Sequence, residues 1–483
     1  MANVRKLQFL LLYFCFFCVS IQFDVTILIL DPLLRVFIFT IAAINVVNYF
    51  FPAPVFVYIS AIMMGYITVC SVITLPRAGR RVIAGLIFIS AILMIYSGAD
   101  LYQWVIGIGR NGMLIALFVC SPLLHLPFQY DNYEAELGNL ARRHMRTMIP
   151  FNLLIAFPTH ILAALTGFAA LGIMYNLFRN ISKYYDAEDI FHASLLRSFA
   201  TSGFWGTSWV SVALVVSIMG IQWHRLILLG IVFTAVSIAI NLMDIMIKMF
   251  RSPGRYPSLP YDDTVFVNWR KLCIMLMMTV LIVLIILVLN LRTGWSLLAI
   301  VPLVSLTFPV LTAIPQRRWK QYKSGVNSFA KIILPKQRLI VSLFTAAGLL
   351  AHALQLSGAG QLIPGLIPSV LIGQPFLLIM LIALLIIVPG QIGVHPVVSG
   401  TTLVATIAPA MLGLTVPQFA MAIIFGWMLS TLLSPFSGMT MTLAGLCGQS
   451  SFRLGIRLNW HYGLICLIVY AAMAVPLSAF LLN

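Results

Sequence analysis

Long apolar runs separated by short polar segments make up most of the chain, for example Cys273–Leu289 and Phe376–Val388. A run near 20 residues crosses the bilayer core as a helix, because only a helix pairs its backbone groups internally. A β-barrel would show shorter segments of alternating polarity, which are absent from these runs. The pattern predicts an all-α polytopic membrane protein with about 11–13 transmembrane helices.

The candidate spans are distributed along the entire sequence. They cover residues 7–23, 33–51, 54–75, 82–97, 103–127, 150–178, 225–247, 272–290, 294–312, 338–356, 374–389, 417–433 and 459–481. The first follows Arg5 and Lys6, as in a signal peptide, but Ser20–Phe23 lacks a small-x-small cleavage pattern. We therefore expect 7–23 to be an uncleaved span.

Composition supports this placement in a membrane. Hydrophobic residues make up 61% of the chain and charged residues only 8%, too few to cover a water-facing surface. The formal net charge of +17 is concentrated in loops beside apolar spans, as in Gln316–Lys336, where the positive-inside rule places it. We expect a multi-pass protein of the cell inner (cytoplasmic) membrane. Its expected partner is the lipid bilayer, and we do not expect it to bind nucleic acid.

Three stretches are too polar for ordinary spans: Phe199–Ser211, Pro389–Thr402 and Ser434–Thr442. Each is rich in Gly, Ser, Thr or Pro. Irregular backbone at membrane depth is tolerated only inside protein or beside water, and broken helices of this kind form carrier binding sites in corresponding positions of two halves. The alternative interpretation is close helix packing through small residues.

A short internal match connects the first two stretches. Thr207–Ser211 aligns with His395–Ser399 at an offset of 188 residues, with Val-Ser shared at its end. This match predicts an internal repeat. Together with the broken-helix pattern of carriers, we expect two inverted repeats with re-entrant hairpins. The third stretch is a candidate break in a discontinuous helix.

Such breaks have a defined chemical use. A helix that starts within the membrane directs free N–H groups and a positive dipole end at the cavity, and unwound backbone can hold Na⁺. We expect a small anionic substrate. The predicted substrate-binding residues are Thr201, Ser202, Thr207, Ser208, Ser211, His395, Ser399, Thr401, Thr402, Ser434, Ser437 and Thr440. The predicted ion-coupling residues are Gly203, Gly206, Gly393, Gly400, Asn241 and Asp244.

With these features, the chain resembles the ion transporter superfamily, which includes divalent anion–sodium symporters, citrate carriers and arsenite carriers. Gly393–Thr402 is similar in place and character to the second hairpin tip of that family, and Thr201–Ser211 to the first. The Ser-Asn-Thr signature of the sodium–dicarboxylate branch is absent from both tips. The resemblance implies a secondary transporter with an elevator mechanism and a homodimer.

The same resemblance implies a scaffold part and a transport part. On this scheme 1–197 holds scaffold spans and an interfacial helix, and 198–250 the first hairpin and transport helices. Residues 251–271 form a central linker, 272–389 the second scaffold spans, 390–450 the second hairpin and transport helices, and 451–483 a C-terminal span. The interfacial helix is expected within Asn180–Arg197, which is polar.

Several single residues allow two interpretations. His395 could couple protons or cap a helix as a neutral imidazole. Asp244 could be an intramembrane carboxylate with a role in ion coupling, or it could form an ion pair with Lys248 one helical turn away. Arg110 could attract an anion or extend its charge to the membrane surface.

Two other classes of function remain open. A membrane-embedded enzyme for lipids or polysaccharides would normally need carboxylate or histidine clusters, and the chain has only 12 acidic residues. A non-transporting subunit of a membrane assembly is the third possibility. We find no metal-binding spacing and no phosphate-binding loop, so we expect no enzyme activity, no metal site and no cofactor apart from Na⁺ as a coupling ion.

Overall fold

The structure is a computed structural model that describes residues 25–75, 77–131, 133–144, 147–167, 169–184, 186–207, 209–252, 264–359, 365 and 367–478. The predicted span 7–23, Ser208 and most of the central linker lie outside these ranges. The described residues form helices and no strand, and nine helical segments among them are long and apolar enough to cross a membrane. The chain is therefore an all-α, multi-pass membrane protein.

The helices divide into two compact units. The first contains 1–119 and 327–358, and the second contains 120–326 and 359–483. By this division 120–197 lies in one unit with 198–250, and the division into scaffold and transport parts stays a prediction.

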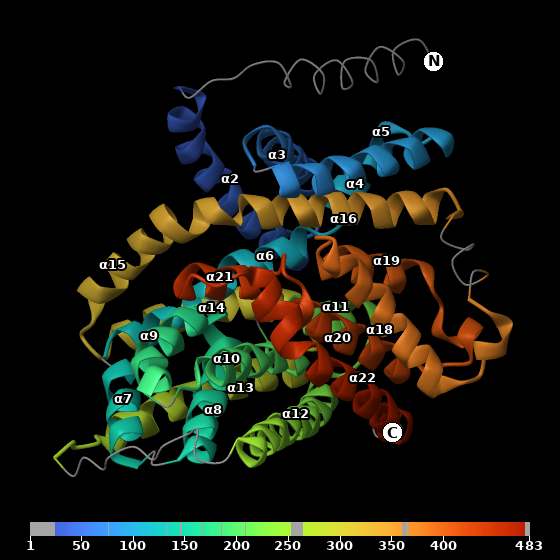
Figure 1. Cartoon of the computed structure of the whole chain (residues 1–483). Coiled ribbons are helices and arrows are strands. Elements are labelled where there is room, and N and C mark those ends of the chain that lie inside the picture. The colour runs from blue at the N-terminus through green and yellow to red at the C-terminus, as the bar shows by residue number, and fades with distance from the viewer. Residues whose placement is uncertain are drawn as a thin grey trace. The chain divides into compact units, whose positions relative to one another are not determined.

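The first unit is built around α16 (Figure 1). This helix packs against α3, α4 and α5, and apolar residues such as Ile83, Met94 and Leu349 form the contacts. Its helices are α2 (Val25–Phe50), α3 (Pro54–Thr74), α4 (Arg77–Tyr96), α5 (Leu101–Gly109), most of α6 (Gly112–Cys120), η3 (Phe329–Ile333), η4 (Leu334–Gln337) and α16 (Arg338–Leu356).

The predicted span 103–127 is interrupted within this unit at Arg110 and Asn111. Asn111 Nδ2 donates to the carbonyl oxygen of Phe344 at 2.9 Å, and Arg110 Nη1 donates to Gln355 Oε1 at 2.6 Å. These bonds hold both polar side chains against α16.

The second unit contains two groups of five helices. The first group is α8 (Met148–Thr166), α9 (Ala169–Tyr184), α10 (Glu188–Thr201), α11 (Val210–Met219) and α12 (Trp223–Arg251). The second is α18 (Pro375–Gln391), α19 (Pro396–Thr406), α20 (Val416–Leu433), α21 (Gly438–Cys447) and α22 (Leu458–Leu477).

The remaining elements precede, connect or follow the helices of the two groups. They are η1 (Ser121–Gln129), α7 (Tyr133–His144), η2 (Ser202–Phe204), α13 (Trp269–Thr293), α14 (Leu297–Ala313), α15 (Trp319–Ser328), η6 (Ser369–Leu371), η7 (Pro409–Leu412) and η8 (Arg453–Arg457).

The two groups repeat one another in order and in packing. α8 begins at residue 148 and α18 at 375, an offset of 227, and α10 and α20 begin at 188 and 416, an offset of 228. In the first group α10 packs against α8, α9 and α12, and in the second α20 packs against α18, α19 and α22. Gly220 and Gly448 end the matching helices α11 and α21 in the same left-handed conformation.

This repeat corrects the alignment expected from the sequence. The break after α10 matches the break after α20, and the turn at Gly393 matches the turn at Gly167. The Val-Ser identity at an offset of 188 is therefore a coincidence of two residues, and the stretches Phe199–Ser211 and Pro389–Thr402 are different parts of the repeat.

Two expected elements also differ. The predicted span 150–178 is two helices, because the chain turns at Gly167 with a φ of 57° and α8 then packs against α9. The predicted interfacial helix was expected to lie on the membrane, but α10 is buried in the protein from Ile190 to Thr201. Within this buried part, Ser194 and Arg197 bond to side chains of other helices.

Candidate functional site

The first broken helix is α10–α11. The backbone leaves the helix after the short turn η2 and resumes at Val210. Glycine makes this path possible, because a Cβ at Gly206 would lie 2.7 Å from the carbonyl oxygen of Ser202 and 2.7 Å from Cδ1 of Trp209. The indole of Trp209 thus fills the space that any larger residue at 206 would need.

The second broken helix is α20–α21, interrupted at Ser434–Ser437. Ser434 Oγ donates to the carbonyl oxygen of Gly390 at 2.6 Å, which connects the break to the end of α18. Ser437 Oγ caps α21 by accepting the N–H of Thr440 at 3.2 Å. The polar residues of this break therefore stabilise its geometry.

The hairpin α18–α19 turns directly beside this break. Gly393 adopts a φ of 93°, a conformation that side chains other than glycine rarely tolerate. His395 caps α19, since its Nδ1 accepts the N–H of Val397 at 3.2 Å. Of the two roles considered for His395, the cap is thus present in the structure.

The two Gly/Ser/Thr-rich stretches meet where α11 packs against α19 and α20. A Cβ at Gly400 would lie 3.1 Å from the ring of Trp427 and 3.6 Å from Leu214. Glycine at this position brings α19 close to both neighbours. The matching contact in the other half is that of α21 with α9.

Most of the predicted hydroxyls in these segments donate to nearby carbonyl oxygens. The residues that do so are Thr201, Ser202, Ser211, Thr401, Ser434 and Thr440. A hydroxyl that donates its proton inward has only lone pairs left for a ligand. In this conformation these six oxygens suit a cation such as Na⁺ better than an anion.

Within α19, α20 and the break between α10 and α11, three buried donors have no hydrogen-bond partner among the described residues: Trp209 Nε1, Thr402 Oγ1 and Ser430 Oγ. Two of these, Trp209 and Ser430, were missed by the sequence analysis. Of the other predicted residues, Thr207 is buried, Ser399 is half-buried and Ser437 bonds to Thr440.

A histidine of α8 lies against the first break. Trp205 Nε1 donates to His160 Nε2 at 2.9 Å, and His160 Nδ1 lies 3.0 Å from Thr201 Oγ1. Because Nε2 accepts, the proton of the neutral ring is assigned to Nδ1, which then donates to Thr201. These two hydrogen bonds connect the end of α10 to the hairpin α8–α9.

Arg197 forms a buried polar network that sequence reasoning also missed. Its guanidinium donates to Asp244 Oδ2 at 2.7 Å, to Asn241 Oδ1 at 2.8 Å and to Asn459 Oδ1 at 2.8 Å. It also lies 4.3 Å from the ring centroid of Tyr462. The network joins α10, α12 and α22.

Asp244 has further partners in Lys248 Nζ, at 2.9 Å, and His461 Nε2, at 3.2 Å. The expected pair with Lys248 is therefore present. Asn241 donates to Asn152 Oδ1 at 3.0 Å. A basic residue inside a predicted interfacial helix, opposite an intramembrane carboxylate, is the signal that could have revealed Arg197.

Comparisons with known proteins identify a fold and no family. No family model and no curated protein matches the chain. Among solved structures, it is similar to the Alcanivorax borkumensis YdaH transporter, whose crystal structure is described as having an unusual topology. The TM-score is 0.50 at 14% identity, over 86% of this chain and 97% of that one. The chain thus shares its fold with a solved membrane transporter.

Proposed function

We propose that this protein is a secondary active transporter that carries a small anion, such as an organic carboxylate, across the inner membrane. One observation carries the proposal: two broken helices occupy matching places in an internal repeat, and each packs against the hairpin of the other half. Repeats with broken helices are the architecture in which carriers build a central site. The fold shared with a transporter supports the same function.

The anion is proposed to bind at the start of α11. This helix begins without a side-chain cap, so its first N–H groups and positive dipole end are available to an anion. The indole N–H of Trp209, the residue before the helix, is buried without a partner among the described residues. Both groups are donors, which an anion requires.

The hydroxyl and carbonyl oxygens around the breaks are proposed to bind Na⁺ as the coupling ion. If the coupling ion is H⁺ instead, a residue of the site is proposed to carry the proton. The hairpins and broken helices would move together as an elevator in a homodimer. Substrate and ion would then cross the membrane in one step.

Transport in liposomes tests the proposal. The purified protein would be reconstituted, and uptake of a panel of radiolabelled mono- and dicarboxylates measured with a sodium gradient, a proton gradient or neither. We expect one gradient to drive uptake of at least one anion above protein-free liposomes. Absence of gradient-driven uptake for every anion in the panel would refute the assignment.

A glycine pair provides the matched control. Gly206→Ala forces Cβ against backbone at the first break, whereas Gly445→Ala in α21 meets nothing within 4 Å. We expect Gly206→Ala to lower the uptake rate about tenfold or more, equivalent to about 1.4 kcal/mol, and Gly445→Ala to leave it unchanged. Equal rates in the two variants would show that the break has no role in transport.

Trp209→Phe tests the anion site itself. It keeps the aromatic packing and removes one donor, so we expect KM for the transported anion to rise about tenfold, as for loss of a hydrogen bond to a charged group. Trp460→Phe on the exposed surface of α22 is the control. An unchanged KM in Trp209→Phe would place the anion elsewhere.

A further inference from the structure

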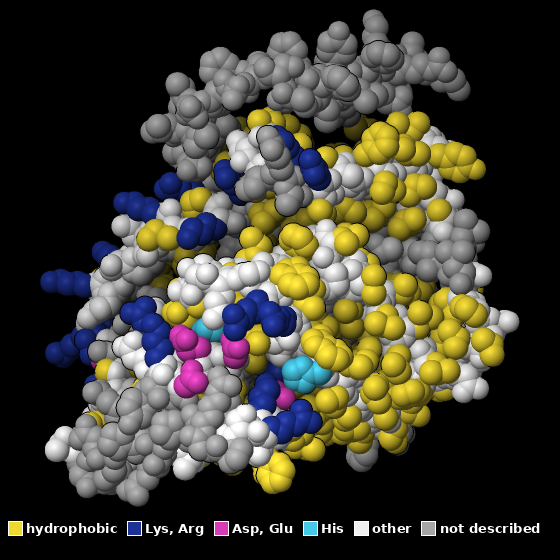
Figure 2. Space-filling model, viewed as in Figure 1, with side chains coloured by type: hydrophobic (Ala, Val, Ile, Leu, Met, Phe, Trp, Pro, Cys, Tyr) yellow, Lys and Arg dark blue, Asp and Glu magenta, His cyan; other side chains and the backbone are white. Residues whose placement is uncertain are grey.

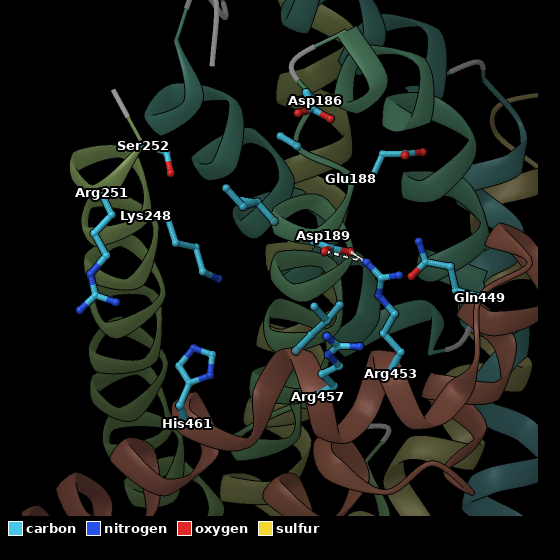
Figure 3. A pocket seen from close by; sticks show the side chains of 13 residues that line it. Asp186, Glu188, Asp189, Lys248, Arg251, Ser252, Gln449, Arg453, Arg457 and His461 are labelled. Carbon is cyan, nitrogen blue, oxygen red and sulfur yellow. Dashed lines mark hydrogen bonds and ion pairs between the residues drawn. The ribbon is translucent and has the colours of Figure 1, made fainter. Parts of the chain in front are cut away.

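A charged pocket of about 620 Å³ lies in the second unit, at the first turn of α10 and away from the breaks in the two broken helices. It forms where the turn before α10, the C-terminal end of α12 and the start of α22 come together (Figure 3). Pockets of this size hold small-molecule ligands. Nothing in the proposed transport cycle uses this pocket.

The pocket has walls of opposite charge. Lys248, Arg453, Arg457 and His461 come from α12, η8 and α22. The acidic wall consists of Asp186, in the turn before α10, and of Glu188 and Asp189, in the first turn of α10. Figure 3 shows Lys248 and His461 on one side of the space and Glu188 across from them. The site therefore offers donors for an anionic group and acceptors for a cationic one.

Only part of this charge is neutralised internally. Arg453 Nη2 donates to both oxygens of Asp189 at 2.9 Å, and Lys248 pairs with Asp244. Arg457 has no acidic partner within 4.0 Å among the described residues. With Arg251, which also lines the pocket without an acidic partner among the described residues, it is the cation most available to a ligand.

Exposed aromatic residues place the pocket at the level of lipid head groups. Phe250, Phe452 and Trp460 are 88%, 58% and 57% exposed, and each directly precedes a residue that lines the pocket. Aromatic side chains gather at membrane–water interfaces. Figure 2 shows charged and histidine side chains grouped beside a broad hydrophobic surface, as expected at such a boundary.

We propose that this pocket binds the head group of a membrane phospholipid that carries a primary amine. Its phosphate would accept hydrogen bonds from Arg457 and Lys248, and its ammonium would donate to Glu188. A quaternary choline group has no N–H to donate to a carboxylate. A glycerol head group leaves the acidic wall without a cation.

Native mass spectrometry of the detergent-solubilised protein tests this inference. Phosphatidylethanolamine, phosphatidylcholine and phosphatidylglycerol with identical acyl chains would be added separately, and the lipid-bound fraction measured. We expect phosphatidylethanolamine to be retained best. Equal retention of the ethanolamine and choline lipids would overturn the proposal.

Three variants separate the pocket from general charge attraction. We expect Arg457→Gln to lower retention of phosphatidylethanolamine about tenfold, and Glu188→Gln to remove its preference over phosphatidylcholine. Arg292→Gln, at the exposed end of α13, should retain lipid like the wild type. Equal retention in Arg457→Gln and Arg292→Gln would contradict the site.

The thermal midpoint checks that the variant is folded. Arg457 is exposed, so its replacement should leave the thermal midpoint unchanged.

A soluble competitor identifies the source of the head group. Glycerophosphoethanolamine carries the same polar atoms without acyl chains. We expect it to displace bound lipid only at a concentration far above that of the lipid. Displacement at an equal concentration would overturn the lipid assignment and point to a soluble phosphate compound. Because the readout is lipid binding, its failure is distinguishable from failure of transport.

Discussion

Arg197 places a positive charge in the interior of the second unit, with only 2% of its side chain exposed. Removing an ion from water costs several kcal/mol, which is offset only where geometry and hydrogen bonding are good. Here one carboxylate, two amide oxygens and the carbonyl oxygen of Leu458 accept from the guanidinium. Since these acceptors lie on two other helices, the side chain fixes their mutual positions.

Arg197→Met should therefore destabilise the protein by about 3 kcal/mol, because it leaves the oxygens of Asn241, Asn459 and Leu458 without their donor. Lys248→Met removes the partly exposed partner of Asp244 and should cost less than about 1 kcal/mol. Thermal unfolding of both variants in one detergent measures the difference. Similar midpoints would show that the buried network adds little to stability.

Glu136 provides a pH-dependent contact outside the candidate spans. The N–H of Asn268, above all, and the ammonium of Lys271 hold the pKa of this carboxyl below its usual value of 4.5. A lowered pKa in the folded state means that the contribution to stability is complete above pH 4.5 and is lost as the pH falls further.

We expect Glu136→Gln to weaken the decline in thermal midpoint of the wild type between about pH 5.5 and pH 3.5, one unit on either side of the ordinary carboxyl pKa of 4.5. Lys271→Gln should weaken it less, because the backbone N–H of Asn268 is the largest cause of the shift. Parallel pH profiles for the wild type and Glu136→Gln would contradict this assignment.

At the scale of elements, the close approach of α18 and α20 depends on glycine. A Cβ at Gly426 of α20 would lie 2.9 Å from both Cα and the carbonyl oxygen of Ala383 in α18. These are backbone atoms, so an added methyl group must separate the two helices. The hairpin α18–α19 is held against α20 through this contact.

Gly426→Ala should accordingly lower stability by about 1–3 kcal/mol, as expected of an overpacked interior. Gly445→Ala has open space around it and should be neutral or slightly stabilising, because alanine favours a helix over glycine. Thermal midpoints of the two variants decide the matter. A stable Gly426→Ala protein would mean that α18 and α20 can separate easily.

Sequence patterns predicted some elements well and others poorly. Long apolar runs located α3, α12, α13, α16, α20 and α22 within a few residues. The break at Ser434–Ser437 was also predicted, because Pro and Gly flank its hydroxyls. The turn at Gly167 was missed, since one glycine in an apolar run carries no local signal. α10 was misplaced because its polar groups bond to residues up to 264 positions away.

At the scale of the whole molecule, the internal repeat makes a topological prediction. Gln222 and Ser450 are matching residues at an offset of 228, each two positions beyond the glycine that ends its helix, and both are exposed. If the repeats are inverted, as we predicted from the sequence, these residues lie on opposite sides of the membrane.

Gln222→Cys and Ser450→Cys, each in a background without other cysteines, test this topology. A membrane-impermeant maleimide applied to right-side-out and inside-out vesicles should label one variant in each. Labelling of both from the same side would rule out inverted repeats. The repeat register itself was not predictable from sequence, because few identities survive between the halves and packing alone reveals it.

The likeness of the two halves also makes their differences meaningful. Arg197 of α10 corresponds to Phe425 of α20 at the offset of 228. One half therefore has an ion network at this position, whereas in the other half Phe425 packs against Phe233 and Tyr470. In a carrier built from equal halves, the inward-facing and outward-facing forms would be equally populated at rest. If the chain is the carrier proposed above, charge on one side of the symmetry and aromatic packing on the other should give it a preferred resting orientation before any gradient acts.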